Sequence, residues 1–437
     1  MPDYSQCPHV NRIVLHGAWH EEATDSLHHG SLTLASGRIV DATDASNRID
    51  PLSPGALEID LRGLMLMPGL INAHDHLQYA LHSRIGKPPY KNYLDWGEDI
   101  HQSCVDAIAR PKLVPKNLRL WWGGVRNLLC GVTTVCHHDP LWPALLDPAY
   151  PIKIVRNYGW AHSVGLAADL KNAYVATSTD SPFIVHACEG VDEVARRELC
   201  DLERLGILND RTVVVHGLAI DESGAMLMRK RHASLILCPS SNQFLFGCLP
   251  ARHVVREIEL VAIGNDSPLT AVGDLLDEVH FAIEHCGIAP EDAFSMITSA
   301  AATLLRLRDG QGTIDVHAIA DLIAVRDTGE TPARRIRTLS WKDIELVMVA
   351  GSVQLASNNV RGRLPDEVCE SLEPLVIDGE VRWLRAPIQQ MIQVSEAALG
   401  TNAVTLGGRP IATLRYDKSD KALLSQPPTQ RVNGMSL

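Results

Sequence analysis

Two histidines in the segment NAHDHL are separated by a single residue and follow an apolar run that is typical of a strand. On a strand, His74 and His76 would lie on the same face, about 6.5–7 Å apart along the backbone. This spacing lets two imidazoles chelate one divalent cation. The pair alone is equally compatible with two histidines at a strand end that have no chemical role.

Three further polar residues follow the same rule, because each of them ends an apolar run. His186 ends PFIVHA, His216 ends TVVVHG and Asp266 ends LVAIGND. In a barrel of parallel strands the carboxyl ends of all strands converge on one face, where active sites lie. Three imidazoles and a carboxylate suit zinc or ferrous iron and leave a position for water. Each residue alone has a structural alternative, such as a helix cap for Asp266, but their recurrence at strand ends favours a metal site.

The stretch from about residue 68 to residue 305 alternates apolar runs rich in β-branched residues with amphipathic segments. Runs such as TTVCHH (133–138) and SLILCPSS (234–241) share this stretch with helical patterns such as VDEVARRELCDLERLGI. Strands that are apolar throughout and separated by about 10–20 helical residues imply a parallel sheet buried on both faces. The length and the repeat predict an α/β protein with a (β/α)₈ TIM-like barrel.

One β/α unit of this barrel is difficult to find. With LMPGLINAHDHL as the first strand, the sequence contains seven clear barrel strands. The missing strand should lie between His162 and Pro182, where NAYVATS is the only candidate and leaves little room for a full helix. We therefore predict an irregular barrel at the fourth unit.

Both ends of the chain contain short strand-like segments. The alternation in SLTLASGRIV and ALEIDLRG predicts half-exposed antiparallel strands, and similar text returns after Gly312. We predict a small β-sandwich built from both chain ends. Its N-terminal part spans 1–67, the barrel 68–311, and its C-terminal part with a closing helix 312–400. A polar tail that includes SQPPTQRVNG is predicted over 401–437.

The composition excludes several other classes of protein. The 437 residues carry a net charge of −12, which disfavours nucleic-acid binding. We find no signal-peptide pattern, no apolar run of the ~18 residues that a membrane span needs, and no GxGxxG or GxxxxGK loop. Ten cysteines without a CxxC pair indicate a reducing compartment. We expect a cytoplasmic homo-oligomer, a dimer, that acts on a small molecule and has no nucleic-acid or membrane partner.

The chain resembles the amidohydrolase superfamily, specifically its mononuclear cytosine deaminase, chlorohydrolase and nucleoside deaminase branch. The resemblance spans nearly the whole chain and rests on MPGLINAHDHL, GVTTV (131–135), HACEG (186–190), VVHG (214–217), CPSSN (238–242), GNDS (264–267), SMITSAAATLLRL and GTIDVHAIADLIAV. It implies one divalent metal ion per chain, Zn²⁺ or Fe²⁺, with the ligands His74, His76, His186 and Asp266. A binuclear branch carries a bridging carbamylated lysine at the fourth strand. Lys153 lies too early for that role and Lys171 lies in a helix-like stretch.

The resemblance also implies catalytic roles for three residues. Asp266 would accept a proton from metal-bound water, whose pKa falls from ~15.7 towards ~7 on the metal. Glu189 would pass that proton to the leaving nitrogen or to a ring nitrogen, although it also fits a charge at the N-terminus of the following helix. His216 would polarise the developing oxyanion or hydrogen-bond the attacking water, and it stays open as a fifth ligand.

Substrate contacts are predicted mainly in the long loop that follows His76. This loop carries aromatic residues and an arginine, which suit a planar substrate, including an anionic one. Trp96 fits equally well a small core within the loop itself. The residues that we predict to contact substrate are Tyr79, Arg84, Trp96, His138, His162, Asn242 and Ser267.

Together these features predict a metal-dependent hydrolase that acts on a C–N bond of a nitrogen-containing, heterocyclic small molecule. Hydrolytic deamination by a metal-bound hydroxide is the preferred reaction. Ring-opening of a cyclic amide and a triazine-type chlorohydrolase reaction are alternatives that use the same residues. A non-enzymatic scaffold barrel is disfavoured because all four ligands and Glu189 are present.

Overall fold

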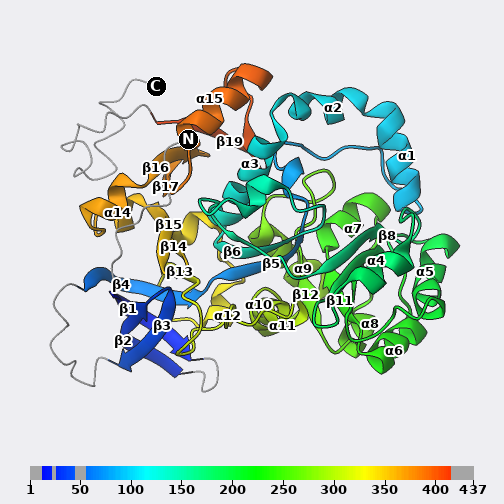
Figure 1. The fold of residues 1–437 in the computed structure, drawn as a ribbon, viewed down its shortest axis with the longest axis horizontal. Coiled ribbons are helices and arrows are strands. Elements are labelled where there is room, and N and C mark those ends of the chain that lie inside the picture. The colour runs from blue at the N-terminus through cyan, green and yellow to red at the C-terminus, as the bar shows by residue number, and fades with distance from the viewer. Residues whose placement is uncertain (1–11, 22–25, 45–55, 415–437) are drawn as a thin grey trace.

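Eight parallel strands form the centre of the protein. The computed structural model describes residues 12–21, 26–44 and 56–414, and Figure 1 shows the arrangement of its elements. The barrel strands are β5 (Leu70–Asp75), β6 (Val132–His137), β7 (Lys153–Ile154), β8 (Gly159–Ser163), β9 (Phe183–Ala187), β10 (Thr212–His216), β11 (Ser234–Leu237) and β12 (Val261–Ile263).

The strands pair in two parallel groups, in the orders β5-β6-β7 and β12-β11-β10-β9-β8. A parallel bridge between Asp75 and Asp266 joins the first strand to the segment after the last one. The barrel therefore closes beside two of the predicted ligands. The predicted (β/α)₈ architecture is confirmed.

The irregularity of the barrel lies between β7 and β8. Only residues 155–158 connect these two strands, and no helix lies between them. The run PIKIVRNYGWAH therefore supplies two strands instead of one. The prediction of a strand at NAYVATS was wrong, because most of this segment forms the helix α4 (Leu170–Ala176). Asp169 begins that helix by accepting a hydrogen bond from the Asn172 backbone N–H.

Helices follow most of the barrel strands and cover the outside of the barrel. Asp192, Asp221 and Asp274 cap three of them by accepting backbone N–H groups of the first turn. Besides α4, the helices of the barrel are α3 (Lys116–Leu129), α5 (Glu193–Arg204), α6 (Glu222–Arg231), α7 (Pro239–Phe246), α8 (Arg252–Glu257), α9 (Leu275–Cys286), α10 (Pro290–Met296) and α11 (Ser299–Leu304), with η3 (Pro143–Leu146) after β6.

The long loop after β5 is partly helical. It contains η1 (Leu77–Tyr79), α1 (Tyr93–Ser103), α2 (Val105–Ala109) and η2 (Arg110–Leu113). Ile85 and Ile100 of this loop pack with Leu269, which follows β12. A backbone bridge between Asn92 and Gly190 also joins the loop to the segment after β9. The loop is thereby attached to two strand ends that carry predicted ligands.

Strands from both chain ends form a second sheet. Its order is β18-β19-β16-β17-β15-β14-β13-β4-β1-β2-β3, and the antiparallel pair of β4 with β13 joins its N-terminal and C-terminal parts. The predicted sandwich is thus one continuous hydrogen-bonded sheet. Its strands are β1 (Ile13–Glu21), β2 (Ser26–Ala35), β3 (Arg38–Asp44), β4 (Leu57–Pro68), β13 (Leu322–Arg326), β14 (Ile344–Val349), β15 (Ser352–Ser357), β16 (Glu373–Ile377), β17 (Glu380–Leu384), β18 (Thr405–Leu406) and β19 (Arg409–Thr413).

Short helices accompany the C-terminal part of this sheet. They are α12 (Pro332–Arg335), η4 (Trp341–Asp343), α13 (Asn358–Arg361), α14 (Asp366–Glu370) and α15 (Ile388–Leu399). The last of these corresponds to the predicted closing helix. The predicted tail begins too early, because β18 and β19 lie after residue 401 and join the sheet. The segment SQPPTQRVNG lies outside the described residues.

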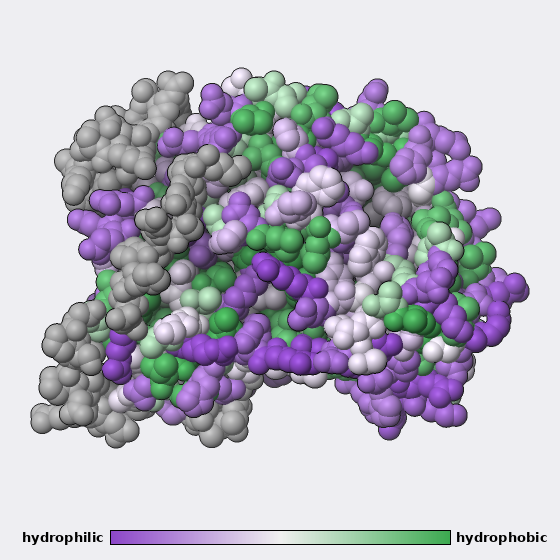
Figure 2. Space-filling model, viewed as in Figure 1, coloured by the Kyte–Doolittle hydropathy of each residue, from purple (hydrophilic) through white to green (hydrophobic). Residues whose placement is uncertain are grey.

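Within residues 12–21, 26–44 and 56–414, each helix is too short or too polar to cross a bilayer. In Figure 2, hydrophilic side chains are interspersed with small apolar areas over the visible face.

A buried carboxyl group links α9 to the beginning of α7. The Glu278 carboxylate accepts a hydrogen bond of 2.8 Å from the Ser240 backbone N–H and another from the Ser240 hydroxyl. Burial raises the pKa of Glu278 to about 8, although the bonds to Ser240 oppose this shift.

This shift makes the free energy of unfolding depend on pH. The usual pKa is 4.5, so the folded state binds the proton more tightly and loses stability as pH rises from about 4.5 to about 8. We expect Glu278→Gln to reduce this loss by up to ~1.4 kcal/mol per pH unit, measured by urea denaturation between about pH 5 and 8. Glu284→Gln, an exposed change on the same helix, is the control. An unchanged slope in Glu278→Gln would contradict the assignment.

Candidate metal centre and active site

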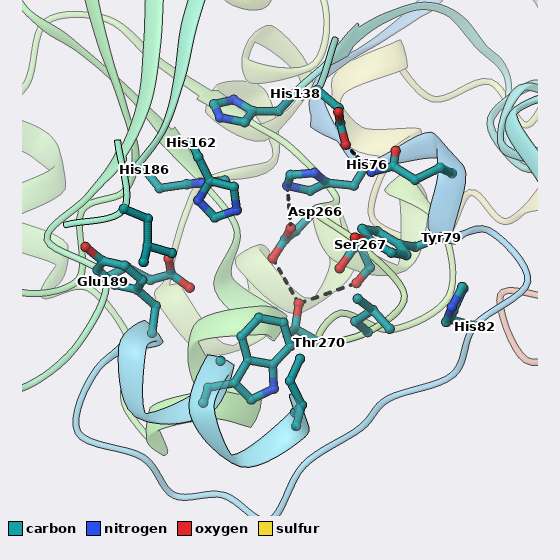
Figure 3. Close-up of a pocket in the computed structure, with 18 of the residues that line it drawn as sticks. His76, Tyr79, His82, His138, His162, His186, Glu189, Asp266, Ser267 and Thr270 are labelled. Carbon is teal, nitrogen blue, oxygen red and sulfur yellow. Dashed lines mark hydrogen bonds and ion pairs between the residues drawn. The ribbon is translucent and has the colours of Figure 1, made fainter. Parts of the chain in front are cut away.

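The four predicted ligands meet at the mouth of the barrel, and Figure 3 shows three of them, His76, His186 and Asp266. His74 lies near the end of β5, His76 follows it, His186 is in β9 and Asp266 follows β12. The Nε2 atoms of His74 and His186 are 3.0 Å apart. Asp266 Oδ1 lies 3.8 Å from His74 Nε2 and 3.6 Å from His76 Nε2.

The backbone takes an unusual conformation where two of these strands end. Asp266 has φ 52° and His216 has φ 73°. This left-handed region is uncommon for residues with a side chain and is found at functional sites. The Asp266 backbone is held there by its N–H, which donates to the His74 carbonyl at 3.0 Å. The turn thus attaches one ligand to the strand that carries another.

Asp75 lies between the two histidines and anchors their strand on the opposite face. Asp75 is fully buried, and its carboxylate accepts hydrogen bonds from Arg126 (2.6 Å), Asn127 (2.7 Å) and Asn72 (3.2 Å). Because alternate residues of a strand face opposite sides, this anchor leaves His74 and His76 on the other face.

The donor atoms form two sets that share His74, and each set could hold a metal ion. The ligand atoms of His74, His186 and His216 lie within 4.8 Å of one another, as do those of His74, His76 and Asp266. Metal–ligand distances of about 2.0–2.2 Å give ligand–ligand separations of this order. Imidazole nitrogens together with one carboxylate oxygen suit zinc or ferrous iron.

The protonation states also suit metal binding. Burial and the neighbouring imidazoles lower the pKa of His76 and of His186 well below the usual range. Burial raises the pKa of Asp266, but the surrounding histidines outweigh this effect and keep that pKa well below its usual value. These shifts favour neutral imidazoles at His76 and His186 and an ionised carboxylate at Asp266, which are the forms that bind metal.

Glu189 and His216 lie together beside the ligands. The Glu189 carboxyl is buried, and burial together with the charges of Asp266 and Glu198 raises its pKa well above the usual value. His216 Nε2 is 3.7 Å from Glu189 Oε1, and burial lowers the pKa of His216 to about 4. The site thus pairs a carboxyl group whose pKa is raised with an imidazole whose pKa is lowered.

The contact of His216 with Asn242 bears on the tautomer of this imidazole. Nδ1 lies 3.1 Å from Asn242 Oδ1. With the amide oxygen facing the ring, Nδ1 carries the proton and Nε2 has a free lone pair. His216 then accepts a hydrogen bond, or binds a metal, through Nε2.

The ligands open into a cavity of about 270 Å³. Five of the residues predicted to contact substrate line it: Tyr79, Trp96, His138, His162 and Ser267. Arg84 and Asn242 are not among its lining residues. The Arg84 guanidinium donates to the Ala271 carbonyl at 3.2 Å and lies over the Phe244 ring, whereas Asn242 contacts His216 behind the cavity.

The sequence analysis missed several residues of this site. Gln78 and Thr270 line the cavity, and so do His82 and Lys112. Ser241 donates to Asp266 from the segment CPSSN, in which only Asn242 was selected. Gln78 follows His76 by two residues, so its nearness to the strand end was a usable signal. His82 and Lys112 could not be placed because the path of the long loop was unknown.

Neither of the lysines considered from the sequence is placed to bridge a second metal ion. The fourth barrel strand, β8, has the sequence GWAHS and contains no lysine. The Lys153 ammonium group is bonded to Asp321 at 2.6 Å, and Lys171 lies in α4. The residues present therefore fit one metal ion.

The site and the fold have counterparts among known proteins. Residues 161–353 match the sequence model of the amidohydrolase family. A 5-methylthioadenosine/S-adenosylhomocysteine deaminase of Syntrophobacter fumaroxidans is 24% identical over 360 residues, which cover 68% of this chain and 80% of that protein. The family match confirms the resemblance predicted from the sequence.

Two solved structures share the fold. A zinc-bound adenosine deaminase from Xanthomonas campestris aligns with a TM-score of 0.65 at 17% identity, over 88% of this chain and 97% of that one. A zinc-bound atrazine chlorohydrolase from Arthrobacter aurescens aligns with a TM-score of 0.66 at 16% identity, over 89% of this chain and 100% of that one. At these identities the likeness concerns the fold alone.

The geometry leads to a direct prediction for metal binding. His186→Ala removes a central imidazole, so we expect the purified variant to lose bound metal, or to bind zinc at least ~100-fold more weakly. Metal content by plasma mass spectrometry and a chelator competition measure this. His253→Ala, which removes an exposed histidine, should keep the metal. Equal metal content in both variants would refute the ligand assignment.

Proposed function

We propose that this chain, whose residues 161–353 match the amidohydrolase family, is a metal-dependent hydrolase that deaminates an amino-heterocycle. The observation that carries the proposal is the buried Glu189 carboxyl group, which lies 3.7 Å from His216 Nε2 and beside the candidate ligands. Bound Zn²⁺ or Fe²⁺ would supply a Lewis acid that makes water a nucleophile at neutral pH. Glu189, His216 and Asp266 would guide the protons.

Glu189 suits the role of general acid. Its raised pKa favours the protonated form of the carboxyl group, whose proton is available to a ring nitrogen or to the departing amine. Ammonia leaves readily only after the amine is protonated, whereas chloride needs no proton. A buried carboxyl group with a raised pKa therefore favours deamination over the chlorohydrolase alternative.

His216 suits the role of an acceptor. The Asn242 contact places the imidazole proton on Nδ1, so the neutral ring presents a lone pair at Nε2. It would hold the attacking water by accepting a hydrogen bond, or serve as a further ligand. Donation to an oxyanion from the same atom is disfavoured unless the ring takes up a second proton.

The cavity favours an uncharged heterocycle. Lys112 is the only lysine or arginine among the described residues that line it, whereas Asp139, Glu189 and Asp266 are acidic. The anionic substrate considered from the sequence loses its support, because the Arg84 guanidinium is bound to a backbone carbonyl.

Two buried acceptor atoms in the wall favour a substrate that donates N–H groups. Gln78 Nε2 donates to Asp139, and Gln78 Oε1 has no hydrogen-bond partner within the described residues. His138 Nε2 lies 3.0 Å from the Ala161 carbonyl, which requires a proton on Nε2 and leaves Nδ1 as an acceptor. His138 Nδ1 also lacks a partner within the described part of the chain.

The proposed reaction can be tested directly. The zinc-loaded protein is incubated with amino-purines and amino-pyrimidines, a chlorotriazine and a cyclic imide, and the release of ammonia, the release of chloride and the opening of the ring are measured. We expect ammonia from an amino-heterocycle. Turnover of the imide or the chlorotriazine without any ammonia would overturn the proposal.

We further propose that the protein is a cytoplasmic homodimer. The nine free cysteines within the described residues support the cytoplasmic location.

Replacement of the general acid should separate metal binding from turnover. Glu189→Gln keeps the size of the side chain but removes the transferable proton, so we expect full metal content and a ~10²–10⁴-fold lower kcat. Glu193→Gln, an exposed change at the start of α5, should retain the normal rate. A near-normal kcat in Glu189→Gln would show that another group moves the proton.

Replacement of Gln78 tests the proposed acceptor wall. Gln78→Leu removes the free carbonyl oxygen, so we expect KM for the amino-heterocycle to rise about threefold to tenfold, the value of one hydrogen bond. Steady-state kinetics on the metal-loaded variant measure this change. Gln102→Leu, on the exposed side of α1, is the matched control. An unchanged KM in Gln78→Leu would exclude a contact between Gln78 and the substrate.

A further inference from the structure

We infer that Ser241 and Thr270 are positioning residues that determine which oxygen of Asp266 faces the metal. The inference rests on the metal centre of the proposed function and concerns the two hydroxyl groups that donate to Asp266. Ser241 Oγ donates to Asp266 Oδ2 at 2.7 Å, and Thr270 Oγ1 donates to the same oxygen at 2.9 Å. Figure 3 shows the bond from Thr270.

The two carboxylate oxygens have different surroundings. Oδ2 accepts from both hydroxyl groups, whereas Oδ1 is the oxygen that lies 3.6 Å and 3.8 Å from the nearest histidine nitrogens. An ionised carboxylate oxygen has about two lone-pair sites. With both sites of Oδ2 occupied, only Oδ1 is free to bind a metal. Asp266 should therefore bind through one oxygen.

This restraint matters because the last torsion of an aspartate is soft. Rotation about that bond is broad and roughly two-fold, so a free carboxylate can exchange its oxygens or present both of them. The backbone of Asp266 is fixed by its bond to the His74 carbonyl, but that bond does not restrain the carboxylate. The hydroxyl groups supply the missing restraint.

Both hydroxyl groups are well placed to act as a rigid support. Ser241 is fully buried and Thr270 is 2% exposed, so water hardly competes for their bonds. Ser241 lies in the first turn of α7, where the preceding Ser240 is fixed by Glu278. Thr270 lies in the turn after β12, and its backbone N–H donates to the Ser267 carbonyl at 3.1 Å.

The beginning of α7 thus contacts two residues of the site. Ser241 holds Asp266, and the next residue, Asn242, holds His216. A support from a separate element can keep the ligand in place while the substrate enters the cavity from the other side. This arrangement explains why two adjacent polar side chains of α7 are completely buried.

The experiment compares Thr270→Val, Ser241→Ala and the double variant with Thr270→Ser. Zinc affinity is measured by chelator competition, and the Co²⁺-loaded proteins are examined by visible absorption. We expect the double variant to bind zinc ~10–100-fold more weakly and to show an altered Co²⁺ spectrum. Thr270→Ser, which keeps the hydroxyl group, should match the wild type in both measurements.

Thr298→Val is the control for a general loss of a buried hydroxyl group. Thr298 is fully buried and donates to the Phe294 carbonyl at 2.6 Å, in the turn between α10 and α11 and outside the cavity lining. We expect this variant to lose thermal stability without any change in zinc affinity or in the Co²⁺ spectrum. A merely structural role for Ser241 and Thr270 would give the same pattern.

Each outcome decides the inference. An unchanged zinc affinity and Co²⁺ spectrum in the folded double variant would overturn it. If the double variant does not fold, the zinc affinities and Co²⁺ spectra of Thr270→Val and Thr270→Ser are compared. A weaker zinc affinity in Thr270→Val supports the inference, and equal results for the two variants overturn it. These measurements need no substrate, so a failure to deaminate leaves them valid. If the wild type binds neither zinc nor cobalt, the metal centre of the proposed function fails first, and this inference fails with it.

Discussion

The carboxylate of Asp266 is a buried negative charge surrounded by imidazoles, and the rest of the site depends on how that charge is compensated. An isolated buried carboxylate is costly unless donors or a cation offset its loss of hydration. On one side, Ser241 and Thr270 donate to Oδ2. On the other side, the Nε2 atoms of His74 and His186 lie 3.0 Å apart. A divalent cation would compensate the charge and bind these nitrogens.

The barrel closes at the same residues. The bridge between Asp75 and Asp266 joins the first strand to the turn after the last one, and the same two segments carry three of the four ligands. A metal bound there would connect positions that are nearly 200 residues apart in the chain. The buried anchor of Asp75 on Arg126 and Asn127 holds this junction from the opposite face. The chemistry and the closure of the barrel therefore share one set of residues.

The sequence predicted the parts of this site that follow from strand periodicity. His74, His186 and Asp266 could be found because each ends a recognisable apolar run on a common barrel face. The third and fourth strands could not be separated, because β7 has only two residues and carries no periodic signal. The sequence could not predict the roles of Arg84, Ser241 and Thr270 for another reason. Their roles depend on side-chain torsions and loop paths, which residue type and spacing do not encode.

The central claim is that these side chains hold one metal ion. Anomalous X-ray scattering from crystals of the zinc-loaded protein, collected on both sides of the zinc edge, tests it most directly. The account predicts a single peak within about 2.0–2.2 Å of the Nε2 atoms of His74, His76 and His186 and of Oδ1 of Asp266. Two peaks at the mouth of the barrel, a peak at other residues, or no peak would contradict it.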